Sequence, residues 1–368
     1  MKTRFHFKKV STGKFDLVLF GLLLGLTSFG LLMIYNSSSV MAYNLFEDKY
    51  HFIKDQIVWS LIGFTGLFFF YKTDYHRLYA FALPLLVLAF ILLLLVFVPG
   101  IGAGALGANR WVNLGFTTLQ PAEFVKLGLA IYLSAWFSHK EKDRFGAFLL
   151  LMGAILFLIM MEPDMGTASI ILFEAAVIYF LSGGSLTYFF VGAPILALIG
   201  YFYIVTAPYR MARLTSFLNL GNSFESTSYH VKQILIALGS GGVFGLGIGN
   251  SIQKYAYLPE NVTDSIFPII AEEFGFIGSI MLILAFAGLI WRGIYIASRA
   301  KDAFGKLLAG GIISFIGIQA VLNLASMTAL MPLTGLPLPF ISYGGSALVV
   351  DLAAMGIILN ISRQSSKR

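Results

Sequence analysis

The sequence predicts an all-α, polytopic membrane protein with about ten transmembrane helices. Of its 368 residues, 58% are hydrophobic and only 12% are charged, and the mean hydropathy is +0.83. A soluble domain carries about 25% charged residues, so this chain has too few polar groups to cover a soluble surface. Apolar stretches of about 18 residues or more, long enough to cross a bilayer, recur along its whole length.

The expected spans are joined by short connections, apart from two longer outer segments. No internal repeat and no polar linker separates soluble domains, so residues 1–368 are expected to form one membrane domain. The first span is too long for a cleaved signal, and no small-residue cleavage site follows it. The ten expected spans are 15–40, 52–71, 76–98, 119–138, 145–162, 166–182, 185–206, 265–292, 303–331 and 341–361.

The distribution of charge predicts the orientation. Most of the 25 Lys and Arg residues fall on the side that holds both tails, 1–14 and 362–368. Because positive residues concentrate on the inner side of membrane proteins, both termini are expected in the cytoplasm. The net charge of +7 then indicates contact with anionic membrane lipid, and no nucleic-acid partner is expected. The absence of cysteine and the five scattered histidines argue against disulfides and against zinc or haem enzymes.

Two outer segments are long enough to suggest a function. The first is Pro99–Gln120, and the second is a large extracytoplasmic loop over 207–264, between the seventh and eighth spans. The large loop contains the apolar stretch Ile234–Gly249, which has too many glycines for an ordinary span. We expect a re-entrant or interfacial segment there, because non-helical backbone at membrane depth needs protein or water around it.

Several charged residues fall inside the expected spans, where ionisable groups are costly. Glu123 and Lys126 are three residues apart and share one helix face. They form a self-neutralising pair that lets a polar helix insert, or a charged wall of a polar cavity, and the two roles are compatible. Glu174 and Asp351 have no basic partner one turn away in the sequence. Each is therefore expected to be protonated or paired with a residue of another helix.

Carboxylates also gather where outer segments enter spans. Asp164 is expected at an interfacial turn, where it can cap the next helix. Asp264 can cap the eighth span or act as a general base at the mouth of a cavity. The helix dipole would lower its pKa, whereas burial and nearby Glu260 would raise it, and the sequence leaves the balance open. At least one of Glu272 and Glu273 should face a partner or water.

The last outer segment, Met327–Ser346, is stiffened by three prolines and ends in Gly344-Gly345. Adjacent glycines can bring backbone N–H groups close to an anion. They also suit a tight turn without any ligand, and that simpler interpretation stays open.

Five motifs in a fixed order identify a family. They are Gly107–Trp111 (GANRW), Gln120–Lys126 (QPAEFVK), Glu162–Thr167 (EPDMGT), Gln253–Glu273 and Pro337–Ser346 (PLPFISYGGS). With ten spans around them, they make the chain resemble the SEDS family (shape, elongation, division and sporulation) of FtsW, RodA and SpoVE over nearly its whole length. The stretches QKYAYLPE and SSSV are more similar to the FtsW/SpoVE branch. Four residues depart from the usual pattern, although Asp264 is retained: His230, Val262, Ser265 and Pro268.

The resemblance implies a peptidoglycan glycosyltransferase that polymerises lipid II at the outer face of the bacterial cytoplasmic (inner) membrane, in cell division. It also implies a class B penicillin-binding protein, a transpeptidase, as partner, together with other divisome proteins. Asp264 matches the family's essential aspartate, and Glu123 and Lys126 match its ion pair. The residues expected to bind substrate or to build the cavity are Arg110, Glu123, Lys126, Asp164, Arg210, Lys254, Glu260, Glu273, Ser342, Gly344 and Gly345.

The residues fit this chemistry. The sugar of lipid II is α-linked to a polyprenyl pyrophosphate and the polymer is β-1,4-linked, so C1 inverts in a single displacement. One base, assigned to Asp264, must take the proton of the acceptor hydroxyl. The charge of the leaving pyrophosphate needs stabilisation. Candidates are the cations Arg110, Lys126, Arg210 and Arg213, or a divalent cation (Mg²⁺ or Mn²⁺) held by the pyrophosphate and one carboxylate, for which Asp264 is a candidate ligand.

Two other functions stay open at this point. A lipid II flippase or transporter would also have ten spans, buried charges and broken helices. The absence of an inverted repeat and the outer position of the acidic cluster disfavour it. A non-catalytic scaffold for division is the second alternative, because Val262 and Ser265 depart from the family pattern.

Overall fold

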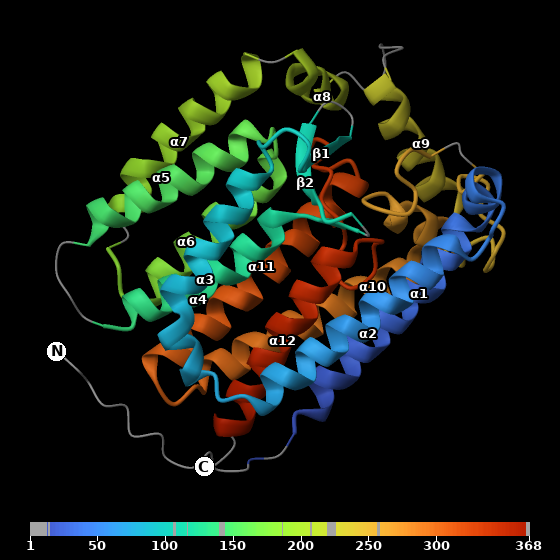
Figure 1. Cartoon of the computed structure of the whole chain (residues 1–368). Coiled ribbons are helices and arrows are strands. Elements are labelled where there is room, and N and C mark those ends of the chain that lie inside the picture. The colour runs from blue at the N-terminus through green and yellow to red at the C-terminus, as the bar shows by residue number, and fades with distance from the viewer. Residues whose placement is uncertain are drawn as a thin grey trace.

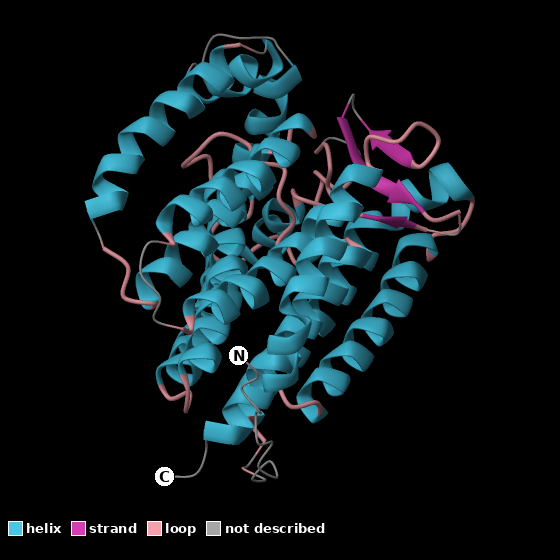
Figure 2. Ribbon diagram, turned by 60° about the vertical axis from the view of Figure 1, so that its left-hand side comes forward, coloured by secondary structure: helices cyan, strands magenta, loops and turns pink. Residues whose placement is uncertain are grey.

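The structure, a computed structural model, describes residues 13, 15–105, 108–115, 117–139, 144–185, 187–206, 208–218, 226–255 and 258–365. Over these residues it is a bundle of α-helices with one small β-sheet (Figures 1 and 2). The expected fold class is confirmed, because each of the ten expected spans contains one helix. These helices are α1 (Leu17–Phe46), α2 (His51–Lys72), α3 (His76–Leu95), α4 (Pro121–Phe137), α5 (Phe145–Met161), α6 (Met165–Leu181), α7 (Thr187–Val205), α10 (Ile266–Ser298), α11 (Ala303–Met327) and α12 (Gly345–Ser365).

Length and hydropathy separate the helices into groups. Among the described residues, α1, α2, α3, α10, α11 and α12 are each long and apolar enough to cross a membrane alone, and α5 and α6 are shorter apolar helices. Two further helices, α8 (Pro208–Leu218) and α9 (Ser226–Ser240), belong to the large loop between α7 and α10. The loop expected over 207–264 is therefore largely structured.

The centre of the bundle is built by α11 and α12. Both are buried over most of their length, whereas α2 and α3 expose most of theirs. Helix α12 packs along α2, and α11 contacts α4, α6 and α10. A Cβ atom at Gly356 of α12 would lie 2.3 Å from the carbonyl oxygen of Leu67 in α2. The two backbones therefore touch, as is usual where small residues line a membrane helix interface.

Helix α10 is broken at Gly275, and the glycine-rich stretch fills the break. Gly275 has φ 67° and ψ −164°, so the regular helical bonds stop there. The N–H groups of Phe276 and Ile277 donate instead to Gly242 and Val243, at 2.9 and 3.2 Å. In return, the carbonyl groups of residues 272 and 273 accept from the N–H groups of residues 246 and 247, both at 3.0 Å. This exchange satisfies the backbone at the break, and the membrane depth of the segment stays a prediction.

A three-stranded antiparallel sheet follows α3 and was not expected. Its strands, in the order β1-β2-β3, are β1 (Gly102–Ala105), β2 (Ala108–Asn113) and β3 (Thr118–Leu119). Cα partners include Ala103 with Trp111 and Val112 with Leu119. The sheet, α8 and α9 lie at one end of the bundle, and the start of α1 and the end of α12 lie at the other (Figure 1). Strand β2 thus brings Arg110 to the end of the bundle that also carries α8 and α9.

Candidate functional site

Asp264 lies in the turn that precedes α10. The helix begins one residue later than expected, so its N-cap is Ser265 and Asp264 does not cap it. The carboxyl group of Asp264 is buried, and a Cβ atom at Gly335 would lie 3.9 Å from its Oδ2 atom. Burial and the charge of Glu260 raise the pKa of Asp264 to about 7, against the opposing effects of Thr263 and Arg213. A carboxyl group with that pKa is well suited to accept a proton at neutral pH.

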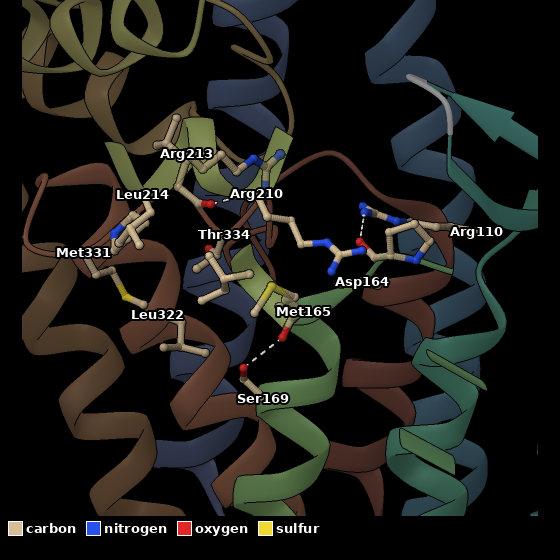
Figure 3. Close-up of a pocket in the computed structure, with 15 residues that line it drawn as sticks. Arg110, Asp164, Met165, Ser169, Arg210, Arg213, Leu214, Leu322, Met331 and Thr334 are labelled. Carbon is tan, nitrogen blue, oxygen red and sulfur yellow. Dashed lines mark hydrogen bonds between the residues drawn. The ribbon is translucent and has the colours of Figure 1, made fainter. Parts of the chain in front are cut away.

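A cavity of about 190 Å³ is lined by three arginines (Figure 3). Asp264 is not among its lining residues, but the charge of Arg213 acts on it. Arg110 comes from β2, and Arg210 and Arg213 come from successive turns of α8. Arg110 donates from Nε to the carbonyl oxygen of Glu162 at 3.1 Å, and Arg213 donates from Nη1 to that of Leu333 at 3.3 Å. Main-chain carbonyls thus orient the guanidinium groups of Arg110 and Arg213. The positive charge facing the cavity suits a polyanionic ligand.

Asp164 also lines this cavity. It is the N-cap of α6, as expected. Its Oδ1 accepts from the backbone N–H of Thr167 at 3.0 Å, and its Oδ2 accepts from the Thr167 hydroxyl at 2.8 Å. Both oxygens therefore already hold a donor of the protein. This side chain positions the start of α6, which lines the cavity through Met165, Gly166 and Ser169.

The segment between α11 and α12 connects Asp264 to the cavity. Leu333 and Thr334 line the cavity, and the next residue, Gly335, lies against the Asp264 carboxyl group. Asn323 of α11 fixes both sides, because its Nδ2 donates to the carbonyl oxygens of Asp264 at 2.8 Å and of Leu336 at 2.7 Å. Asp264 and the arginines therefore sit on two sides of one short, anchored segment.

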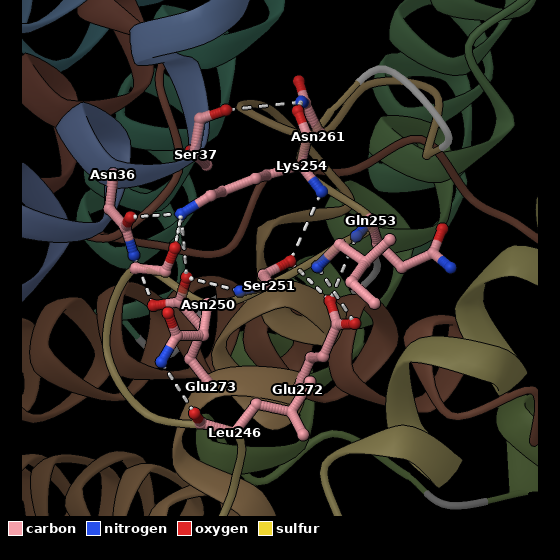
Figure 4. A network of polar contacts seen from close by, with 12 residues as sticks. Asn36, Ser37, Leu246, Asn250, Ser251, Gln253, Lys254, Asn261, Glu272 and Glu273 are labelled. Atoms are coloured by element: carbon pink, nitrogen blue, oxygen red, sulfur yellow. Dashed lines mark hydrogen bonds and ion pairs between the residues drawn. The ribbon is translucent and has the colours of Figure 1, made fainter.

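Glu272 and Glu273, two turns into α10, clamp the preceding loop (Figure 4). The Glu272 carboxylate accepts from the backbone N–H groups of Ile252 and Gln253, at 3.2 and 3.3 Å, and from the Ser251 hydroxyl. Glu273 pairs with Lys254 at 3.4 Å. Both glutamates are buried, and both have partners. The expectation that at least one of them faces a partner is therefore met by both. Lys254 and Glu273, expected to bind substrate or to build the cavity, hold the loop that leads to Asp264.

Lys254 and Asn36 tie this clamp to α1. The Lys254 ammonium group donates to Asn36 Oδ1 at 3.0 Å and to the carbonyl oxygen of Gly249 at 2.5 Å. Asn36 donates in turn to Glu273. Nothing in the sequence close to Asn36 suggested this role, since its partners Lys254 and Glu273 are more than 200 residues from it.

Two residues that depart from the family pattern contact each other beside Asp264. Nε2 of His230, in α9, lies 2.8 Å from the hydroxyl oxygen of Ser265. Burial and the charge of Arg213 lower the pKa of His230 to about 4, so its ring is neutral at pH 7. The contact joins α9 to the turn that carries Asp264. Val262, a third departure, is buried in the main hydrophobic core.

The remaining expected residues, Glu260 and the Ser342–Gly345 turn, do not line the arginine cavity. Glu260 is exposed, and its Oε2 accepts from the Thr263 hydroxyl at 2.9 Å. The Ser342 hydroxyl accepts from the N–H of Leu338 at 2.8 Å. The N–H of Gly344 donates to Gln56 of α2 at 3.2 Å, and Gly345 packs against Trp59. The Ser342–Gly345 turn is thus bound by α2, and none of its residues lines the arginine cavity.

Glu123 and Lys126 form the expected ion pair in α4. Lys126 Nζ lies 2.7 Å from Glu123 Oε2, and both side chains are buried. Lys126 also donates to Gln319 Oε1 at 2.6 Å. Lys126 does not line the arginine cavity, so it is placed to support α4 and α11.

A resident metal centre has little support in the part of the chain described here. No group of three or more His, Asp or Glu side chains among these residues could hold a metal ion. Asp264 could supply one oxygen ligand to a divalent cation, and the exposed Glu260 a second. The other ligands would have to come from a bound diphosphate or from water.

This fold and site define a class: a multi-pass helical membrane protein with a buried carboxyl group and an arginine-lined cavity at one end of the bundle. The family model described as "Cell cycle protein", for FtsW, RodA and SpoVE, matches residues 16–367. The chain belongs to this family.

Individual relatives agree over almost the full length. Stage V sporulation protein E of Bacillus subtilis (strain 168) is 40% identical over 358 residues, covering 95% of this chain and 97% of the relative. A probable peptidoglycan glycosyltransferase FtsW of Geobacter sp. (strain M18) is 40% identical over 356 residues, covering 95% and 96%.

Solved structures show the same architecture. One, described as "Structural coordination of polymerization and crosslinking by a peptidoglycan synthase complex", superposes with a TM-score of 0.79 at 26% identity, over 96% of this chain and 99% of that chain. The rod shape determining protein RodA of Thermus thermophilus superposes with a TM-score of 0.71 at 26% identity, over 96% and 98%.

Proposed function

We propose that the chain is a peptidoglycan glycosyltransferase that polymerises lipid II at the outer face of the cytoplasmic membrane during cell division. Relatives with 36–40% identity over nearly the whole chain are named for this activity. The observation that carries the proposal is the buried Asp264 carboxyl group, with a pKa of about 7, beside a cavity holding three arginines.

Asp264 is the general base of the proposed reaction. The acceptor hydroxyl oxygen attacks C1 of the donor sugar as the C1–pyrophosphate bond breaks on the opposite face, and the configuration changes from α to β. Asp264 takes the hydroxyl proton, so the new glycosidic oxygen is left neutral. A pKa near 7 leaves a substantial share of the group ionised at neutral pH while keeping it basic enough to accept the proton. No covalent intermediate with the protein forms.

The arginine cavity binds the leaving group. Polyprenyl pyrophosphate carries away the electron pair of the broken bond, and its charge grows in the transition state. Arg110, Arg210 and Arg213 supply charge and N–H donors that match phosphate oxygens. Because carbonyl groups already orient Arg110 and Arg213, little reorganisation is needed when the charge develops. Asp264 would be the residue to hold a divalent cation, which would supply further positive charge to the leaving diphosphate.

The proposed partner is a class B penicillin-binding protein, with other divisome proteins around it. The support is the superposition on a solved structure described as a peptidoglycan synthase complex that coordinates polymerization and crosslinking. Both termini are placed in the cytoplasm by the charge distribution, which leaves α8, α9 and the sheet outside.

Reconstitution tests the proposed function directly. The purified chain is placed in liposomes with lipid II and the transpeptidase partner, with a β-lactam present to prevent crosslinking. Glycan strands resolved by electrophoresis, and removed by muramidase, are the expected product. Movement of fluorescent lipid II between leaflets with no glycan strands would identify a flippase and contradict the proposal.

A further inference from the structure

In the described part of the helix bundle, three buried carboxyl groups lie around one buried ammonium group, that of Lys126. Lys126 lies within electrostatic reach of Glu123, Glu174 and Asp351. These residues come from α4, α6 and α12, and α11 adds Gln319. All three carboxyl-bearing residues are at most 2% exposed.

Only one of the three carboxyl groups is paired. Glu123 forms the 2.7 Å ion pair with Lys126. Within the described part of the chain, neither oxygen of Glu174 and neither oxygen of Asp351 has a hydrogen-bond partner. Among the described residues, the charged groups that act on Asp351 are Lys126 and Glu123, and the one that acts on Glu174 is Lys126. Within the described residues, the neighbouring helices α2, α5, α10 and α11 add no further charge that acts on either group.

Charge balance then decides the state of these groups. If all three carboxyl groups were ionised, the core would carry two negative charges in excess of Lys126. An unpaired ion in a membrane interior costs several kcal/mol, because neither water nor a counter-ion solvates it. A neutral carboxylic acid in the same place costs far less.

We propose that Glu174 and Asp351, together with the Glu123–Lys126 pair, form a proton-binding centre in the membrane core that holds two protons at neutral pH. The centre is distinct from the outer site of Asp264, and the proposal is independent of the glycosyltransferase reaction. It is connected to the outer end through Gln319, whose Oε1 accepts from Lys126 at 2.6 Å and whose Nε2 donates to the carbonyl oxygen of Pro337 at 3.0 Å. Loss of the protons would therefore disturb both the helix packing and the segment after Pro337.

Infrared spectroscopy of the purified protein in lipid nanodiscs tests the proposal. A protonated carboxylic acid has a carbonyl stretch that is separate from those of carboxylates and amides. At neutral pH, part of this signal should disappear in Glu174→Gln and another part in Asp351→Asn. The control Asp48→Asn removes an exposed carboxylate paired with Lys54 at 2.7 Å, and it should leave the signal unchanged. An unchanged signal in both core variants would overturn the proposal.

Thermal unfolding gives a second readout that needs no spectral assignment. The folded state holds protons that the unfolded state releases, so the folding equilibrium constant should fall about tenfold per pH unit for each proton held. The wild type should therefore lose stability as the pH rises above about 4, the ordinary carboxyl pKa in the unfolded chain, until the centre has released its protons. Glu174→Gln/Asp351→Asn should lose less, by up to about a hundredfold per pH unit within that range. Because Gln and Asn imitate the neutral acids, this double variant should fold.

Three results would count against the proposal in this second experiment. The first is a double variant that fails to fold, since that would show that ionised carboxylates are required. The second is the same pH dependence in the wild type and the double variant. The third is stabilisation of the wild type alone by sodium ions at constant ionic strength, which would assign the site to a metal cation instead of protons.

Discussion

Replacing Glu260 by Gln should move the pH dependence of glycan polymerisation to lower pH. The Glu260 and Asp264 carboxyl groups both contact the Thr263 hydroxyl, at 2.9 and 3.3 Å, so they lie no more than about 6 Å apart. At an effective dielectric constant of about 20, two charges at that distance repel by about 3 kcal/mol. Glu260 is exposed, and solvent screening reduces this to about 1.4 kcal/mol, which corresponds to about one pKa unit.

The sign of the shift follows from the role of Asp264. A general base works when it is deprotonated, so the rate falls as the pH drops through its pKa. Removing the neighbouring negative charge should lower the pKa of Asp264 from about 7 to about 6. The variant should therefore keep its activity about one pH unit further into acid. The informative quantity is the pH at which the rate falls on the acidic side, and not the rate at high pH.

The assay is the initial rate of glycan synthesis from lipid II at low substrate concentration, measured from about pH 5 to about pH 9, a range that brackets both pKa values. Asp48→Asn provides the control, because it also removes an exposed acid but one that is paired with Lys54. Its profile should coincide with that of the wild type. An acidic limb that stays in place in Glu260→Gln, or that moves to higher pH, would refute the assignment of this limb to Asp264.

Three further predictions concern other parts of the structure. Arg213→Gln should lower kcat/KM by roughly 10- to 100-fold, as expected for a lost charged hydrogen bond. The control Arg299→Gln, at the end of α10 that lies away from Asp264, should have no effect in the same assay. Lys126→Met leaves Glu123 buried without its partner and should destabilise the fold by about 3–5 kcal/mol. Adding Glu123→Gln to this variant should restore part of the melting temperature. An equal loss of melting temperature in the single and the double variant would contradict the ion-pair account. His230→Ala removes the contact with Ser265 and should cost about 1 kcal/mol, and His230→Gln, which can still reach the hydroxyl, should recover most of the melting temperature.

The transmembrane helices were predictable from sequence because the bilayer imposes one simple requirement on each of them. A span needs a long apolar stretch, and such a stretch is visible without any knowledge of its neighbours. The capping role of Asp164 was also predictable, since a cap acts on the helix that follows it directly. The ion pair of Glu123 and Lys126 follows from their spacing within one helix.

Contacts between distant segments were not predictable in the same way. Asn323 and Gln319 connect the outer segments to α11, yet the only sequence signal was two amide side chains, one turn apart, in an apolar span. Strand β1 consists only of glycine and alanine, which lack the β-branched character of ordinary strands, and β3 has only two residues. The break in α10 depends on hydrogen bonds to residues about 30 positions earlier.

The pKa of Asp264 shows most clearly what the structure adds. From sequence, the helix dipole and burial were opposing effects of unknown size. The structure moves the N-cap to Ser265 and buries the carboxyl group of Asp264. Burial then outweighs the interactions that favour the charged form, and the pKa rises.

The most direct test of the central claim is glycan polymerisation by Asp264→Asn in liposomes with the transpeptidase partner. The substitution keeps the size of the side chain and removes only its ability to accept a proton. The account predicts a rate at least about 100-fold below that of the wild type, with an unchanged melting temperature and unchanged binding of lipid II. Glycan strands formed at the wild-type rate by this variant would contradict the account.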